Sequence, residues 1–213
     1  MTRFTFVRHG QSEGNLHELF IGQTNLPLTA LGRMQAAKSR DHLKNEHFDL
    51  AIASPLLRAY ETGSIVLGDR PLPLLPNDNI REIWGGEWEM KKFADLPLLY
   101  PDDFSIWHED IGRARCTGGE SVKELGERVV GEVLRIAREH PGKSILAASH
   151  ATPIRTLMTY ASGIPLEQAQ NVPWPANASV SVFTVDEEGT LRVECYGEAS
   201  HLGNLSTTLP KNI

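Results

Sequence analysis

Arg8 and His9 are the residues of this sequence with the clearest chemical potential, because they directly follow a short apolar segment. Residues 4–7, Phe-Thr-Phe-Val, have the aromatic and β-branched composition of a buried strand, and Gly10 lets the chain turn sharply after His9. In open α/β sheets, ligands bind beyond the carboxyl ends of the strands. The pattern therefore places a guanidinium cation and a titratable, nucleophilic imidazole where a substrate would bind.

Two further basic side chains, Arg58 and His150, occupy the same kind of position along the chain. Each follows an apolar run of strand length, at residues 49–53 and 144–148. The carboxyl ends of parallel strands meet at one edge of a sheet. We therefore expect both side chains to lie beside His9, although they are far from it in sequence.

Two arginines and two histidines at one site describe a pocket for an anion, and phosphate is its natural ligand. The guanidinium group offers a rigid fork of donors that matches phosphate oxygens, and the first turn of a helix adds backbone N–H groups. A neutral histidine can attack a phosphorus atom held in such a pocket. The departing alkoxide then needs a proton, and our candidate for the acid is Glu82.

Each of these residues also has a purely structural interpretation. A lone histidine such as His150 is usually a hydrogen-bonded scaffold residue, while Arg58 and Glu82 have the character of ordinary surface charges. His9 and His150 could instead bind a metal ion. Two arginines beside a cation are electrostatically unfavourable, however, and no closely spaced histidine pair accompanies them, so we expect no metal.

Apolar periodicity and capping residues predict strands that alternate with helices. The expected strands are residues 4–7, 49–53 and 72–75, the last an edge strand, followed by 144–148 and a hairpin of 179–185 with 191–195; the expected helices are 30–43, 54–67, 121–136 and 152–163. This alternation is typical of an α/β fold with a mostly parallel sheet and helices on both faces. The polar residues 197–213 carry no pattern that predicts a structure.

The length of 213 residues favours one domain, residues 1–213, with an insertion over the active site at about 83–120. Hydrophobic residues make up 40% and charged residues 23%, as in a soluble globular protein. The net charge of −6 argues against non-specific binding of nucleic acid. With neither an apolar run long enough for a membrane span nor a leader, we expect a cytoplasmic protein that does not bind membranes. Cys116 and Cys195 are expected to be free thiols.

The motifs resemble those of the histidine phosphatase superfamily, also called the phosphoglycerate mutase-like family. The segments that carry the resemblance are residues 6–12 with Asn15, Leu28-Thr29-Ala30-Leu31-Gly32, Ser54-Pro55 with Arg58-Ala59, Gly118-Gly119-Glu120-Ser121, and Ser149-His150. They occur in the order typical of the family. The resemblance implies a three-layer α/β/α sandwich and a phosphohistidine mechanism without a metal, and we expect no cofactor.

The resemblance also assigns roles to the residues that match. It makes His9 the nucleophile, Glu82 the proton donor, and Arg8, Arg58 and His150 the residues that clamp the phosphoryl oxygens.

Three further positions are expected to bind substrate. Asn15 and Thr24 match positions that line the phosphate pocket. Ala151 begins an Ala-Thr-Pro sequence that stands where the family often has a glycine-rich one, which affects the backbone donors there.

Three activities stay open at this point. A phosphatase lets water discharge the phosphohistidine, and we favour it because Glu82 is followed by Ile83-Trp84 rather than by the arginine and tyrosine of the cofactor-dependent mutases. A phosphoglycerate mutase-type transfer is the first alternative, and a non-catalytic phospholigand-binding module is the second. Arg113 and Arg115 would favour a substrate with a second anionic group if they faced the pocket.

The expected partner is a small phosphorylated metabolite, and the leaving group is not evident from the sequence. Trp84, Trp88 and Trp107 would favour a bulky, partly apolar one. The oligomeric state also stays open, with a homodimer among the options.

Overall fold

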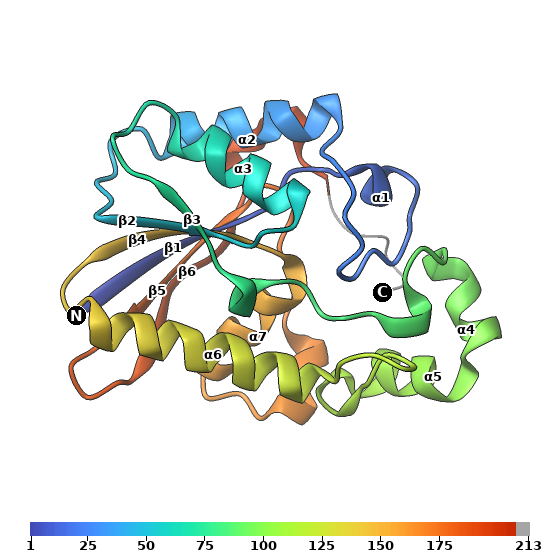
Figure 1. The fold of residues 1–213 in the computed structure, drawn as a ribbon. Helices are drawn as coiled ribbons and strands as arrows, with labels where there is room; N and C mark the ends of the chain where they lie inside the picture. Colours follow the sequence, from blue (N-terminus) through green and yellow to red (C-terminus); the bar gives the residue numbers. More distant parts are fainter. Residues whose placement is uncertain (208–213) are drawn as a thin grey trace.

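A mixed β-sheet runs through the computed structural model, which describes residues 1–207 (Figure 1). Within these residues the sheet has six strands: β1 Thr2–Arg8, β2 Leu50–Ala53, β3 Leu74–Pro76, β4 Ser144–Ser149, β5 Val180–Val185 and β6 Leu191–Glu198. Their spatial order is β3-β2-β4-β1-β5-β6. Strands β1 to β4 are parallel to their neighbours, whereas β5 runs antiparallel to β1 and forms a hairpin with β6. The predicted parallel sheet, its edge strand and its terminal hairpin are confirmed.

The register of the two central strands sets up the active site. Arg8, the last residue of β1, pairs with Ser149, the last residue of β4. The next residues, His9 and His150, therefore emerge side by side from the carboxyl end of the sheet. The backbone N–H of His9 donates to the carbonyl of Ser149 at 2.9 Å, which carries the pairing one residue further.

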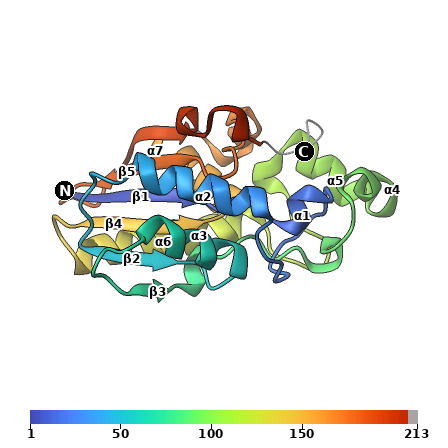
Figure 2. The same cartoon turned by 90° about the horizontal axis from the view of Figure 1, so that it is seen from above.

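Helices cover both faces of the sheet, as expected for a three-layer sandwich (Figures 1 and 2). Helices α2 (Ala30–His42) and α3 (Leu57–Leu67) lie on one face, and α6 (Val122–Glu139) and α7 (Ala151–Ala161) lie on the other. The core between these layers is apolar, and Phe6 and Phe183 pack edge to face within it.

The predicted helix caps are confirmed at two helices and corrected at two. Thr29 caps α2 by accepting a hydrogen bond from the N–H of Gly32, and Ser121 and Glu124 form the capping box of α6. Helix α3 begins at Leu57 rather than at the predicted Ser54-Pro55, and the Ser54 hydroxyl lies 2.8 Å from His150 and accepts from the N–H of Leu56 at 3.4 Å, before the helix begins. Helix α7 begins at Ala151, one residue earlier than expected.

Residues 83–120, predicted to be an insertion, fold into short helices beside the carboxyl ends of the strands. They include α4 (Leu96–Leu99) and α5 (Pro101–Glu109), which lie near the short helix α1 (Glu13–Leu16) (Figures 1 and 2). Trp88 is fully buried and packs against Trp107. The aromatic side chains thus attach this segment to the body of the protein.

The chain after β6 is more ordered than its composition suggests. Ser200–Leu205 forms a 3₁₀ helix against α2, and the side-chain amide of Gln35 donates to the carbonyl of Leu205 at 2.7 Å. The part of the predicted tail from residue 208 onward lies outside the described residues. Cys116 and Cys195 are free thiols, as predicted. Among the described helices, none combines the length and apolar character needed to cross a membrane.

Candidate active site

The carboxyl end of the sheet brings the predicted basic residues together. The imidazole rings of His9 and His150 lie with their centroids 5.2 Å apart, and the Nε of Arg58 is 3.3 Å from the Nε2 of His9. Arg8, His9 and Arg58 line the adjoining pocket together with Glu82. His150 is fully buried directly beside His9.

The hydrogen bonds of His9 leave one ring nitrogen available as a nucleophile. Its Nδ1 is 2.7 Å from the carbonyl oxygen of Gly10, and a carbonyl can only accept, so Nδ1 carries the proton. Its Nε2 faces Arg58, which can only donate, so this nitrogen bears the lone pair. Burial lowers the pKa of His9 well below its ordinary value of 6.5, and the nearby charges of Arg58 and Arg8 lower it further. The imidazole is therefore neutral and nucleophilic at neutral pH.

Arg58 is held in one orientation by the loop that precedes α2. Its Nη1 donates to the carbonyl of Thr24 at 3.0 Å, and its Nη2 donates to the carbonyl of Gly22 at 2.7 Å. These two bonds leave the Nε edge of the guanidinium group facing His9. Burial lowers the pKa of Arg58 to about 10, so the group keeps its positive charge at neutral pH.

Arg8 and His150 supply polar atoms that are buried and lack a partner among the described residues. The Nη1 of Arg8 donates to the carbonyl of Pro175, but its Nε has no partner, and neither has the Nδ1 of His150. The other ring nitrogen of His150 lies 2.8 Å from the hydroxyl of Ser54. Buried polar atoms of native proteins are nearly always paired. Two of them beside two buried arginine cations form a site suited to an anion with several oxygens.

Glu82 reaches the same pocket from the loop between β3 and α4. Its Oε1 accepts from the N–H of Ile83 at 2.8 Å, and its Oε2 lies 3.5 Å from the N–H of Thr152. Burial raises the pKa of this carboxyl group and outweighs the opposing effects of these N–H groups and of Arg58. The carboxyl group therefore keeps its proton to a higher pH than an exposed glutamate, as a general acid must.

The three predicted substrate-binding residues differ in their placement. Asn15 and Ala151 line the pocket, Asn15 with its Oδ1 accepting from Asn177 and Ala151 at the first position of α7. Thr24 does not line it. Its hydroxyl donates to Glu89 at 2.5 Å and its carbonyl accepts from Arg58, which makes it a support for the arginine.

Two supporting residues of the site escaped the sequence analysis. Glu89 accepts hydrogen bonds from the N–H groups of Gln23 and Gly85, and thereby holds the loop that orients Arg58. The Nδ2 of Asn177 donates to the carbonyl of His9 at 3.1 Å. A carboxylate next to a glycine-rich turn was a weak signal for Glu89, whereas nothing in the sequence links position 177 to position 9.

The mouth of the pocket is apolar. Its walls are formed by Leu19, Phe20, Ile21, Ile83, Phe93, Trp107 and Trp174. Trp174 is stacked parallel to Trp107 on one side, and the guanidinium group of Arg155 lies 4.1 Å from its ring centroid. Of the three tryptophans considered from the sequence, Trp107 is the one that lines the pocket, since Trp88 belongs to the core and Trp84 is exposed.

Arg113 and Arg115 do not line this pocket. Both are exposed, and Arg115 forms an ion pair with Glu124 at 2.6 Å. Within the described part of the chain, no group of three or more His, Cys, Asp and Glu side chains is arranged to hold a metal ion.

Comparison with known proteins agrees with this geometry. The family model of the histidine phosphatase superfamily (branch 1) matches residues 4–197. The chain belongs to this superfamily. The match covers every residue of the candidate site, and it confirms the family that the motifs indicated.

Individual members of the superfamily show the same relationship. An adenosylcobalamin/alpha-ribazole phosphatase of Escherichia coli is 33% identical over 165 residues, which cover 78% of this chain and 81% of that protein. Phosphoserine phosphatase 1 of Hydrogenobacter thermophilus is 29% identical over the full length of both chains. The solved structure of Bacillus stearothermophilus YhfR superposes with a TM-score of 0.90 at 28% identity, covering 95% of this chain and all of that one. The protein is thus an enzyme of the phosphatase and phosphoglycerate mutase-like type, with the α/β fold of these relatives.

Proposed function

We propose that the protein is a metal-independent phosphomonoesterase that acts through a phosphohistidine on His9, with Glu82 as the proton donor. One observation carries this proposal: a neutral Nε2 of His9 faces the same pocket as two buried arginine cations and a carboxyl group with a raised pKa. The nucleophile, the anion clamp and the acid needed for phosphoryl transfer therefore share one site.

The chemistry divides into two transfers that balance. In the first, the lone pair of His9 Nε2 forms a bond to phosphorus as the bond from phosphorus to the ester oxygen breaks. That oxygen takes the proton of Glu82 and leaves as an alcohol. In the second, a water molecule attacks the phosphohistidine and gives its proton to the Glu82 carboxylate, which releases inorganic phosphate and restores neutral His9.

The arginines support both transfers by holding the phosphoryl oxygens. Arg8 and Arg58 are fixed by backbone carbonyls and carry full charges in a buried site, so they need little reorganisation as charge develops. Electrostatic stabilisation of this kind is often the largest single contribution to catalysis. His150 lies against His9, where it completes the clamp with its unpaired Nδ1.

The apolar mouth supports a small phosphorylated metabolite whose leaving group has an aromatic or aliphatic part. Phe20, Phe93, Trp107 and Trp174 would contact that part, while Arg8, His9, Arg58 and Glu82 of the same pocket would contact the phosphate ester. Such a division, apolar walls with a few placed polar groups, is typical of small-molecule sites.

The phosphoglycerate mutase-type alternative requires the site to retain a substrate that carries a second anionic group. Arg113 and Arg115, the arginines that might have held this group, lie outside the pocket. The non-catalytic alternative requires neither a nucleophile nor an acid, and it would leave unexplained why His9 and Glu82 line the same pocket. These observations favour the phosphatase.

A screen of phosphorylated metabolites tests this proposal, with the wild-type protein and the His9→Ala variant assayed in parallel. Phosphate release and the isomerisation of phosphoglycerate are measured separately. We expect phosphate release by the wild-type protein alone, fastest for esters with an apolar leaving group. Isomerisation without phosphate release would identify a mutase, and undiminished turnover by the variant would overturn the role of His9.

A further inference from the structure

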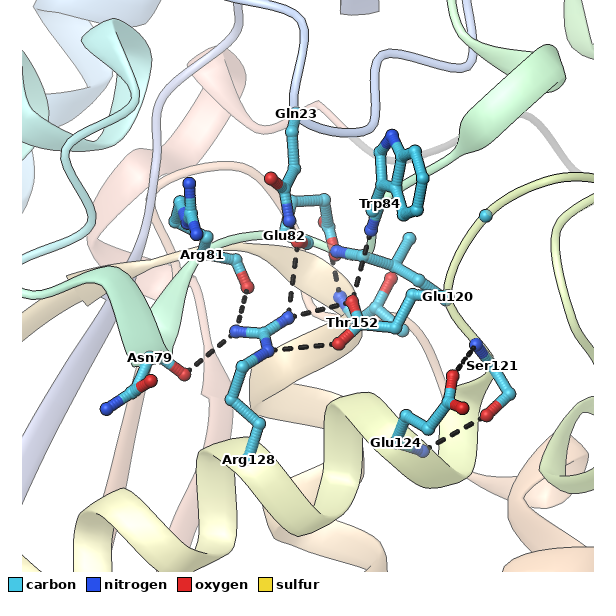
Figure 3. A network of polar contacts seen from close by, with 12 residues as sticks. Gln23, Asn79, Arg81, Glu82, Trp84, Glu120, Ser121, Glu124, Arg128 and Thr152 are labelled. Atoms are coloured by element: carbon cyan, nitrogen blue, oxygen red, sulfur yellow. Dashed lines mark hydrogen bonds and ion pairs between the residues drawn. The ribbon is translucent and has the colours of Figure 1, made fainter.

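Arg128 of helix α6 lies outside the pocket, yet its guanidinium group holds the backbone that leads to Glu82. Its Nη1 donates to the carbonyls of Asn79 and Arg81 at 2.8 and 3.1 Å, and its Nη2 lies 3.4 Å from the carbonyl of Glu82 itself (Figure 3). One side chain thus gathers three carbonyl groups within four residues of the chain.

The opposite edge of the same guanidinium group is fixed by Glu120. Arg128 Nε and Nη2 donate to the two carboxylate oxygens at 3.0 and 2.9 Å, the bidentate geometry that gives arginine pairs their directionality. Glu120 also accepts from the N–H of Trp84 at 3.1 Å (Figure 3). The Arg128–Glu120 pair therefore holds the chain on both sides of Glu82. Both side chains are largely buried, which protects the pair from screening by solvent.

This backbone is anchored by the buried side chains of Ile80 and Ile83, and the carbonyl of Trp84 accepts from the N–H of Glu120 at 2.8 Å, but it lacks the hydrogen bonds of regular secondary structure. Residues 81–85 belong to no helix or strand, so no regular ladder of hydrogen bonds satisfies their carbonyls. The side-chain amide of Gln23 reaches the carbonyl of Glu82 at 3.0 Å (Figure 3). The carboxyl group of Glu82 contacts the adjacent N–H of Ile83 and, at 3.5 Å, the N–H of Thr152. Arg128 is thus one of the groups that fix the backbone from which the Glu82 side chain extends.

We propose that Arg128, supported by Glu120, is a positioning residue that holds Glu82 within reach of the leaving-group oxygen. This inference rests on the proposed role of Glu82 as the proton donor. Arg128 neither contacts His9 nor lines the pocket, so its contact with the site runs through the backbone of Glu82, while its positive charge adds to the effect of burial in lowering the pKa of His150. A displacement of a catalytic group by about 1 Å is enough to lower the rate on the order of 100-fold. Loosening the loop that carries Glu82 is therefore expected to slow the reaction.

The test measures the effect of replacing Arg128 on the turnover of two substrates, first in the wild-type protein and then in a protein that lacks the acid of Glu82. Arg128→Gln and Arg128→Lys are assayed on an alkyl phosphate, whose alkoxide needs a proton to leave, and on p-nitrophenyl phosphate, whose phenolate leaves without one. We expect Arg128→Gln to lower kcat on the alkyl phosphate by about 10-fold to 100-fold, and to change turnover of the aryl phosphate by less than about threefold. Arg128→Lys falls between the wild type and Arg128→Gln, because an ammonium group cannot bridge the carboxylate and the carbonyls together.

Arg135→Gln is the matched control. Arg135 lies on the same helix and makes an equally bidentate pair with Glu132, at 2.7 and 2.9 Å, but it contacts none of the carbonyls next to Glu82. Glu132 also accepts from the side-chain amides of Asn77 and Asn79. The Arg135 variant therefore reports what the loss of an arginine pair does to α6 and to the start of this segment, while the carbonyls of Arg81 and Glu82 keep their donor. We expect the ratio of the two activities to stay at the wild-type value.

The double variant Glu82→Gln/Arg128→Gln decides whether Arg128 acts through Glu82. Once the acid is gone, the second substitution is expected to cause no further loss on the alkyl phosphate. A full additional loss in this background, or an equal loss on both substrates in the single variant, would show a merely structural role and overturn the inference. If Glu82→Gln alone left turnover of the alkyl phosphate unchanged, the assignment of Glu82 as proton donor would fail, and the inference would fail with it. This result comes from the Glu82 single variant and is therefore distinguishable from a failure of the Arg128 inference.

Discussion

Replacing Glu82 with glutamine removes the acidic proton while it preserves the shape of the side chain. The amide oxygen of glutamine can still accept from the N–H of Ile83, which now lies 2.8 Å from Oε1. Arg8 and Arg58 bond to backbone carbonyls rather than to Glu82, so the anion clamp stays in place. The substitution therefore tests proton donation with little disturbance of phosphate binding.

The size of the effect depends on the leaving group. General acid catalysis typically raises the rate by about 10²- to 10⁴-fold, and the full effect is expected only for a poor leaving group. We expect kcat/KM of Glu82→Gln to fall by about that factor for alkyl phosphates and by less than about tenfold for p-nitrophenyl phosphate. A plot of log kcat/KM against leaving-group pKa should consequently become steeper in the variant.

The pH dependence supplies a second measurement on the same variant. Burial raises the pKa of Glu82, and the protonated form is the active one. Wild-type activity on alkyl phosphates is therefore present below this raised pKa and lost as the pH rises through it. In Glu82→Gln this alkaline limb should vanish, because the amide does not titrate. Equal losses on alkyl and aryl esters, or an unchanged alkaline limb, would refute the assignment of Glu82.

Three further predictions follow from the other parts of the site. Arg58→Ala should lower kcat by about 10²- to 10³-fold, the usual cost of a lost donor to a developing oxyanion, and Arg58→Lys should lose less because it keeps the charge; equal activity of all three proteins in steady-state kinetics would contradict the clamp. Dialysis against a chelator should leave turnover unchanged, and a loss that added metal restores would overturn the metal-independent mechanism. Phe93→Ala should raise KM about threefold to tenfold for an arylalkyl phosphate and leave a small alkyl phosphate unaffected, whereas an equal change for both esters would show that the aromatic wall does not select the leaving group.

The convergence of the basic residues was predictable because a parallel sheet imposes a simple geometry. Each of His9, Arg58 and His150 comes directly after an apolar run or in the next turn of helix, and the strands deliver them to one edge whatever their separation in sequence. The helix caps at Thr29 and Ser121 were predictable for a similar reason, since their hydrogen bonds close within three residues.

The supports of the site depend on tertiary contacts that carry no local pattern. Ser54 has the sequence signature of a helix cap, and its hydroxyl does accept from the nearby N–H of Leu56, but its contact with His150 at 2.8 Å joins positions 96 residues apart. Thr24 turns toward Glu89, 65 residues away, rather than into the pocket. From the sequence, Arg128 has the character of an exposed residue of an amphipathic helix. Its contact with the carbonyl of Asn79, in the loop before Glu82, is visible only in the folded protein.

Phosphorylation of His9 is the central claim, and rapid-quench trapping tests it most directly. Wild-type protein is mixed with a slowly hydrolysed phosphomonoester, quenched in alkali, where phosphohistidine survives, and digested for mass spectrometry. The mechanism predicts a phosphoryl group on His9 that forms before phosphate is released, decays with the turnover rate, and is absent from His9→Ala. Phosphate release by the wild-type protein with no label on His9, or with the label on another residue, would contradict it.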